Sequence, residues 1–172
     1  MDPMRLVKAD TEFPPCAAEV LRVVPGRFVG AVSEQLRSAA VEEVRFRVDR
    51  PVQLRTQHDE IMLRQLRPFT REEAKRMLET VCSYSVYAKE QELARGFIGL
   101  PGGVRVGVAG EPVIEDGRIA RLTDVTCFNI RIPREIKGCA EPFLQMFTEK
   151  TGDDVRPVST LVAAPPGVGK TT

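Results

Sequence analysis

The spacing of apolar residues along the chain predicts its helices. Phe28, Val32 and Leu36 recur every four residues, which places them on one face of a helix. Thr70 and Glu73 have the spacing of a capping box, in which each side chain binds the backbone amide of the other residue, and an apolar stripe follows them. Further helices are expected over residues 13–24, 85–95 and 141–149.

A period of two predicts the strands. Val44, Phe46 and Val48 alternate with charged residues, which gives a strand with one apolar and one charged face. The same alternation occurs in residues 104–109 and 128–133, and shorter strands are expected at 52–54 and 61–63. Residues 159–164 have the composition of a short buried strand. The pattern therefore predicts an α/β (α+β) fold, with helices packed on a mixed β-sheet in an N-terminal domain of residues 1–155.

Composition narrows the class of protein without naming a function. Apolar residues make up 42% of the 172, enough for a sizeable core. The 25 Lys and Arg residues nearly balance 24 Asp and Glu, so net charge gives no general case for nucleic-acid or acidic-membrane binding. We expect no transmembrane segment and no signal peptide, because no apolar run approaches the required length.

The cysteines and the single histidine point to no metal site. The four cysteines lie far apart, without a C-x-x-C pair, and His58 has no second ligand nearby in the sequence. The cysteines are interpreted as reduced and mostly buried thiols of a cytoplasmic protein.

The strongest chemical signal is a P-loop pattern, G-x-x-x-x-G-K-[ST], in residues 164–171, where alanine takes the first glycine position. Gly167 and Gly169 let backbone amides turn towards phosphates. Lys170 is expected to reach the β- and γ-phosphates, and the Thr171 hydroxyl to hold Mg²⁺. The predicted cofactors are ATP and Mg²⁺, with Lys170 and Thr171 as catalytic residues. The nucleotide-binding residues are expected to be Pro166, Gly167, Val168, Gly169, Lys170, Thr171 and Thr172.

A working P-loop also needs the helix that follows it, whose amides and dipole hold the phosphates. The 172 residues include neither that helix nor a Walker B acid. We therefore expect residues 156–172 to be the start of a P-loop ATPase domain, and the chain as given not to hydrolyse ATP.

From about residue 42 to residue 172, the sequence resembles the stage III sporulation protein AA family. The resemblance lies in EVRFRVDRP (43–51), SVYA (85–88), GFI (96–98), PGGVRVGVAG (101–110), NIRIPREIKG (129–138) and PPGVGKTT (165–172). The departures are Val104, where the family often has histidine, and Val168, where it often has cysteine. Phosphate chemistry requires neither position.

The resemblance implies a motor ATPase related to the type II and type IV secretion ATPases. Its N-terminal domain would precede a RecA-like ATPase domain, here truncated, and the full-length protein would form a homo-oligomeric ring. The resemblance implies that the protein is located in the mother-cell cytoplasm. There it would be held at the membrane by binding to membrane-embedded sporulation channel proteins. ATP turnover would drive assembly of that mother cell–forespore channel or transport through it.

Arginines in the polar phase of the predicted strands allow two interpretations. Arg45, Arg47, Arg105 and Arg131 could form a basic face if these strands share a sheet, and guanidinium groups suit phosphate. Arginines outside the core ATPase domain approach nucleotide in related secretion ATPases, so Arg105 and Arg131 are candidate nucleotide-sensing residues. The alternative is a solvated face paired with Asp and Glu.

Tyr84 and Tyr87 are interpreted as packing aromatics rather than a nucleotide-stacking platform, and His58 as a surface residue. The competing class is a non-enzymatic adaptor or nucleic-acid-binding domain of a P-loop translocase. Low net charge and only two tyrosines weigh against a single-strand platform, so no direct nucleic-acid partner is expected.

Overall fold

A computed structural model describes residues 14–38, 40–133, 138, 141–151 and 154–163. The chain divides into two compact units, Met1–Pro133 and Arg134–Thr172. Each unit is described by itself. The predicted domain boundary at 155/156 stays a prediction.

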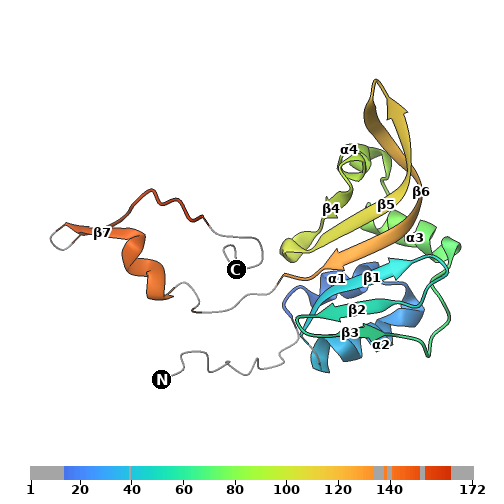
Figure 1. Cartoon of the computed structure of the whole chain (residues 1–172), viewed down its shortest axis with the longest axis horizontal. Coiled ribbons are helices and arrows are strands. Elements are labelled where there is room, and N and C mark those ends of the chain that lie inside the picture. Colours follow the sequence, from blue (N-terminus) through green and yellow to red (C-terminus); the bar gives the residue numbers. More distant parts are fainter. Residues whose placement is uncertain (1–13, 39, 134–137, 139–140, 152–153, 164–172) are drawn as a thin grey trace. The chain divides into compact units, whose positions relative to one another are not determined.

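The first unit contains one six-stranded sheet, with strand order β3-β2-β1-β6-β5-β4 (Figure 1). Its strands are β1 (Val41–Arg47), β2 (Gln53–Thr56), β3 (Glu60–Met62), β4 (Phe97–Gly99), β5 (Arg105–Glu115) and β6 (Arg118–Arg131). The α+β class is confirmed, with one difference from expectation. Every described pairing in this sheet is antiparallel, whereas a mixed sheet was predicted. The cause is connection length: β1–β2, β2–β3, β4–β5 and β5–β6 are joined by links too short for the crossover that parallel neighbours need.

Helices contribute the other half of the core. They are α1 (Ala17–Val23), α2 (Gly26–Ser38), α3 (Arg71–Val81) and α4 (Glu90–Ala94), with a 3-10 turn, η1 (Tyr87–Lys89), before α4. The helix predicted over residues 85–95 is therefore broken in two. In Figure 1, α1 and α2 lie behind β1–β3. The three apolar residues predicted for one face of α2 are all buried there.

An aromatic cluster joins these helices to the sheet. Phe28 of α2 contacts Phe46 of β1 edge to face, with ring centroids 5.7 Å apart. Phe69, just before α3, packs between Phe46 at 5.2 Å and Phe128 of β6 at 6.2 Å. All four rings are fully buried. The predicted apolar phase of β1 and β6 therefore faces the helices.

The start of α3 is fixed by the capping box that the sequence predicts. The Thr70 hydroxyl accepts from the Glu73 amide at 3.2 Å, and the Glu73 carboxylate accepts from the Thr70 amide at 2.9 Å. The same carboxylate accepts from Arg27 of α2, Nε to Oε1 at 2.5 Å and Nη2 to Oε2 at 2.7 Å. The hydrogen bonds from Arg27 lower the pKa of Glu73 despite its partial burial. The Glu73 carboxylate of α3 thus binds the Arg27 side chain of α2 and connects the two helices.

Beyond the core, β5 and β6 continue as a long hairpin closed by a turn at Asp116 and Gly117, both of which have positive φ (Figure 1). The register shifts between Ala109 and Glu111, next to Gly110. A Cβ at Gly110 would lie 2.6 Å from the Thr123 carbonyl oxygen, so the irregularity requires glycine. Opposite it, the Asp124 carboxylate accepts a hydrogen bond from Arg71 of α3, which fixes the base of the hairpin.

The second unit differs from expectation. Residues 141–149 were predicted to be a helix, but only a 3-10 stretch, η3 (Glu141–Met146), forms. A two-stranded sheet follows, with β7 (Thr148–Thr151) antiparallel to β8 (Asp154–Pro157). Threonines at 148 and 151 favour extended backbone over helix.

The Arg27–Glu73 pair gives a pH-dependent prediction. Glu73→Gln keeps an acceptor for the capping box but removes the charge that Arg27 binds, so we expect a loss of about 1–3 kcal/mol near neutral pH. Because the folded pKa of Glu73 lies below its unfolded value, this contribution is complete above about pH 4.5 and disappears as pH falls through the folded pKa. Thermal melting at several pH values measures it. The exposed neighbour Glu72→Gln is the matched control; equal losses in both variants would contradict the assignment.

The Gly110 irregularity gives a second prediction, one of packing. Gly110→Ala should cost about 1–3 kcal/mol, because the new methyl group meets backbone atoms that cannot move independently. Gly107→Ala in the same strand is the control, since its Cβ would come no closer than 3.7 Å to any neighbour. Urea unfolding of the two variants provides the comparison. Indistinguishable midpoints would show that the hairpin does not depend on glycine here.

Candidate functional site

The P-loop residues, 164–172, lie outside the described part of the chain. These include Pro166, Gly167, Val168, Gly169, Lys170, Thr171 and Thr172, so their roles stay predictions. The segment before them departs from expectation. Residues 158–163 form no strand, and Leu161 is 93% exposed, although residues 159–164 were predicted to be a short buried strand. A buried strand needs strands on both sides, and no described strand pairs with this segment.

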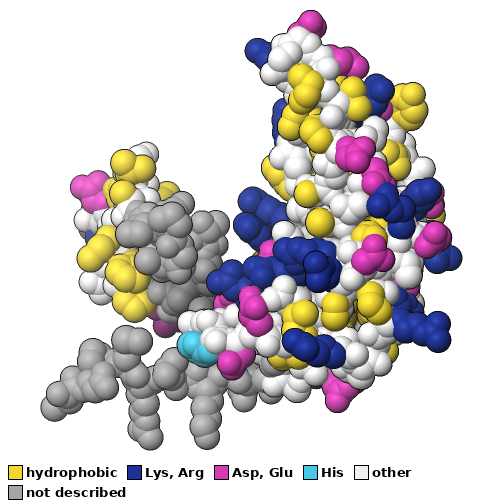
Figure 2. Space-filling view, turned by 45° about the vertical axis from the view of Figure 1, so that its right-hand side comes forward, with side chains coloured by type: hydrophobic (Ala, Val, Ile, Leu, Met, Phe, Trp, Pro, Cys, Tyr) yellow, Lys and Arg dark blue, Asp and Glu magenta, His cyan; other side chains and the backbone are white. Residues whose placement is uncertain are grey.

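Candidate residues that the structure does describe lie on the sheet face opposite the aromatic cluster. Antiparallel partners share a face, so the register defines its members. We call this the arginine face: it carries five arginines against two glutamates, namely Arg45, Arg47, Arg55, Arg105 and Arg131 with Glu43 and Glu60. Figure 2 shows Lys and Arg side chains gathered in a band across the middle of this unit, with Asp and Glu beside them. The strands do share one sheet, which is the condition that the basic-face interpretation required.

Glu43 is the central acid of this face. Its side chain is only 9% exposed, and it lies on β1 directly opposite Arg131 of β6. Oε2 of Glu43 accepts from Arg45 Nε at 2.8 Å, and Arg45 Nη1 also reaches Glu60 at 3.3 Å. Arg131 Nε lies 3.9 Å from Glu43 Oε1, an ion pair without a hydrogen bond. Arg45 therefore fits the interpretation in which the arginines pair with nearby Asp and Glu residues. Arg131 fits it less well, because its ion pair with Glu43 is long.

Arg105 and Arg131 are brought together directly. They are opposite partners in the β5–β6 ladder, and both are exposed. Within the described residues, no carboxylate lies within ion-pair distance of Arg105, whose guanidinium instead lies 5.9 Å from the Phe97 ring centre. Two like charges directly opposite each other destabilise an antiparallel pair unless something neutralises them. The two candidate nucleotide-sensing arginines thus form one basic pair.

Asn129 is a neighbour of this pair that sequence reasoning did not single out. It lies two residues before Arg131 on the same face, opposite Gly107. Its Oδ1 is buried and has no hydrogen-bond partner among the described residues. A buried unpaired polar atom is uncommon and calls for an explanation. Alternation alone could have placed Asn129 on this face, but not its lack of a partner.

The interpretation of Tyr84 and Tyr87 as packing aromatics is wrong. Their exposures are 81% and 87%. Ser83 and Tyr84 both adopt positive φ in the turn after α3, which directs the chain away from the core. His58 is exposed, as expected. Cys16 and Cys82 are buried, and burial raises the pKa of both thiols, so they stay protonated.

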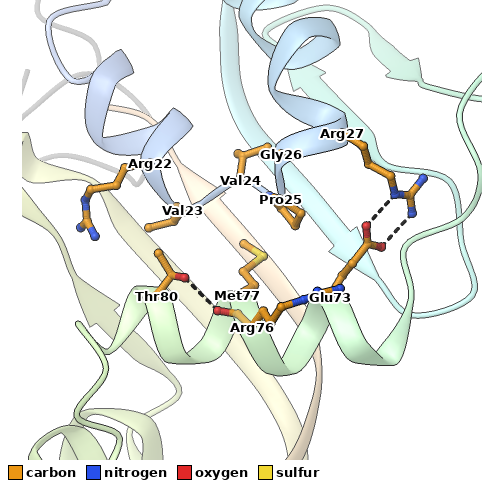
Figure 3. A pocket seen from close by; sticks show the side chains of 10 residues that line it. All are labelled: Arg22, Val23, Val24, Pro25, Gly26, Arg27, Glu73, Arg76, Met77 and Thr80. Carbon is orange, nitrogen blue, oxygen red and sulfur yellow. Dashed lines mark hydrogen bonds and ion pairs between the residues drawn. The ribbon is translucent and has the colours of Figure 1, made fainter.

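A separate recess of about 420 Å³ lies where the turn between α1 and α2 meets α3 (Figure 3). Its polar groups are largely used within the fold. Arg27 binds Glu73, and the Thr80 hydroxyl donates to the Arg76 carbonyl at 2.8 Å. Arg22, at its rim, pairs with Glu19 at 3.0 Å. These contacts serve helix packing, and the recess carries no set of groups that would activate a substrate.

The described residues contain no group of three or more His, Cys, Asp or Glu side chains placed to hold a metal ion. None of their helices has the length and apolarity that a bilayer crossing requires.

Comparison with known proteins identifies the family. A family model described as sporulation stage III, protein AA matches residues 18–172. Stage III sporulation protein AA of Bacillus subtilis (strain 168) is 36% identical over 156 residues, which cover 90% of this chain and 48% of that protein. The chain therefore belongs to the stage III sporulation protein AA family, and it spans about half the length of this curated relative.

A solved structure was also found to be similar. It is the VirB11 ATPase from the Brucella suis type IV secretion system, crystallised in complex with sulphate. The TM-score is 0.42 and the identity 18%, and the match covers 79% of this chain and 39% of that chain.

Proposed function

We propose that the whole protein is a P-loop ATPase that acts in sporulation, and that these 172 residues are its N-terminal part. The observation that carries the proposal is the sequence Gly169-Lys170-Thr171 at the end of a chain that belongs to the stage III sporulation protein AA family. In this proposal Lys170 stabilises charge on the transferring phosphoryl group and Thr171 holds Mg²⁺. It is the whole protein, rather than these residues alone, that hydrolyses ATP.

The proposed setting follows from the same family membership. The protein would assemble as a homo-oligomeric ring in the mother-cell cytoplasm, against membrane-embedded channel proteins. ATP turnover would power assembly of the mother cell–forespore channel or transport through it. Arg105 and Arg131 would contribute from the N-terminal domain, either to the nucleotide of their own subunit or across a ring interface. Support for this last role comes from their directly opposed, exposed positions.

A second candidate function, nucleic-acid binding, has one observation in its favour. Exposed Tyr84 and Tyr87 could stack bases, which would suit a nucleic-acid-binding domain of a P-loop translocase. The nearly balanced charge of the chain gives such binding little electrostatic support. A filter-binding titration with a single-stranded oligonucleotide discriminates the two candidates.

The P-loop assignment predicts the effect of one substitution. Lys170→Ala in the full-length protein should reduce steady-state ATP hydrolysis to background, because the γ-phosphate loses its main cationic partner. The melting temperature of the N-terminal domain should not change, since the described core, at residues 16–132, excludes the P-loop. Hydrolysis that survives this change with little loss would refute the proposal.

The arginine assignment predicts a second effect on turnover. Arg131→Ala in the assembled full-length protein should lower turnover at least about tenfold, which corresponds to about 1.4 kcal/mol of transition-state stabilisation. Its side chain is 76% exposed, so stability should change by no more than about 1 kcal/mol. Arg55→Ala, on the same face but opposite acids in both neighbouring strands, is the matched control. Unchanged turnover per ring would assign Arg131 to a solvated surface only.

A further inference from the structure

The hairpin of β5 and β6 extends past the neighbouring strands of the sheet. The ladder with β1 covers residues 127–131 of β6, and the ladder with β4 covers residues 105–107 of β5. Residues 111–115 and 118–123 lie beyond both ladders and pair with each other. In Figure 1 this part projects away from the body of the first unit. We call residues 111–123 the hairpin arm.

The hairpin arm has one apolar face. Ile114 and Ile119 are opposite partners in the ladder, so their side chains share a face, and they are 55% and 45% exposed. Pro112 and its partner Leu122 extend this face towards the core, against which Leu122 packs. Figure 2 shows hydrophobic side chains exposed along the projecting part. Exposed apolar residues that adjoin one another in this way indicate a contact surface.

The turn at the end of the hairpin arm is acidic. Asp116 is exposed, and its carboxylate has no partner among the described residues. Glu115, beside it, has only a 3.8 Å ion pair with Arg121, which is too long for a hydrogen bond. The arm therefore ends in an apolar pair followed by one unpaired and one weakly paired carboxylate.

The recess between the α1–α2 turn and α3 has the complementary character (Figure 3). Val24, Pro25 and Met77 give it an apolar lining, and the packing of Val24 and Met77 in the core holds that lining in place. Arg76 of α3, also in the lining, is exposed, and its guanidinium has no partner among the described residues. The helix α2 begins here, at Gly26, without an acidic residue in its first turn, so the positive end of its dipole favours an incoming carboxylate.

We propose that the hairpin arm of one copy of this chain docks into the recess of a second copy. Ile114 and Ile119 pack on the apolar lining, and the Asp116 carboxylate pairs with the Arg76 guanidinium. Both isoleucines are exposed within one copy, so the arm does not occupy the recess of its own chain.

The two surfaces differ, so the contact is heterologous. Each copy donates its arm to one neighbour and receives the arm of another, and repetition of this step closes a ring or extends a filament. The inference rests on the proposed function in one respect: it names the subunit contact of the proposed ring. The contact itself requires no nucleotide.

The test is whether two defective variants restore each other. Sedimentation of the 172-residue chain over a concentration series measures self-association. Ile114→Thr/Ile119→Thr disables the arm while keeping β-branched residues in the strands, and Arg76→Glu disables the recess. Each variant alone should associate at least about tenfold more weakly than the unchanged chain. Lys75→Glu, an exposed charge reversal on α3 outside the recess, is the matched control and should associate normally.

An equimolar mixture of the two defective variants carries one intact arm and one intact recess. It should form one-to-one dimers and nothing larger, with an affinity within about threefold of the unchanged contact. A mixture that stays monomeric would overturn the proposal, as would an unchanged chain that stays monomeric. Normal self-association of Arg76→Glu would also overturn it, because an arm-to-arm contact does not use the recess.

The ion pair is tested by a change that preserves the turn. Asp116→Asn keeps a residue that adopts positive φ before glycine, so the hairpin should not change. It should weaken self-association about two- to fivefold at low salt, and by less than about 1.5-fold once Arg76→Gln is present. Asp59→Asn, in the exposed turn between β2 and β3, is the matched control. An equal effect of Asp59→Asn would reject the pairing of Asp116 with Arg76.

Melting temperatures are recorded for all variants. If the threonine variant unfolds, the cycle of Asp116→Asn and Arg76→Gln decides instead, because both positions are exposed. Association is measured without nucleotide, whereas the ATPase proposal is tested by Lys170→Ala in the full-length protein. Failure of one proposal is therefore distinguishable from failure of the other.

Discussion

Strand β6 is the element on which the first unit depends, because it pairs with β5 along nearly its whole length and with β1 over residues 127–131. Its alternation sends Phe128 and Ile130 to the core and Asn129 and Arg131 to the opposite face. A slip of one residue would exchange the two sets, burying a guanidinium and exposing a phenyl ring. The pairing on both sides prevents this slip. The position of the candidate arginines is thus set by the same register that builds the core.

The fold of the first unit also depends on the contacts where α2, α3 and the sheet meet. The Glu73 carboxylate serves at once as the capping-box partner of Thr70 and as the acceptor for Arg27. The Arg27 guanidinium also lies 4.0 Å from the Phe28 ring centre, beside the aromatic cluster. One polar contact therefore sets both the start of a helix and its distance from its neighbour. This junction stabilises the layer against which β6 packs.

Sequence reasoning succeeded where a local rule determines the outcome. The Thr70–Glu73 spacing predicted a helix start, and period two predicted which faces of β1 and β6 are buried; both are confirmed. It failed where the outcome depends on distant partners. The composition of residues 159–163 suits a buried strand, but burial requires neighbouring strands that no local pattern reveals. Tyr84 failed for a related reason: it lies in a turn with positive φ that composition does not indicate, and Tyr87 follows in the 3-10 turn η1.

For the candidate site, the sequence placed Arg105 and Arg131 on polar faces of strands, but their direct opposition needed the register. Neither Glu43 nor Asn129 was singled out, because a glutamate in a charged strand looks ordinary until its burial is known. The P-loop itself was read from its residues alone, and its roles stay predictions.

The division of the sheet into a helix-covered face and an arginine face has an evolutionary consequence. Substitutions among exposed arginines cost little folding free energy, whereas those in the aromatic cluster cost several kcal/mol. Mutation can therefore explore new recognition chemistry on one side while selection for a stable fold acts on the other. Such a domain can acquire a different ligand without first losing its architecture.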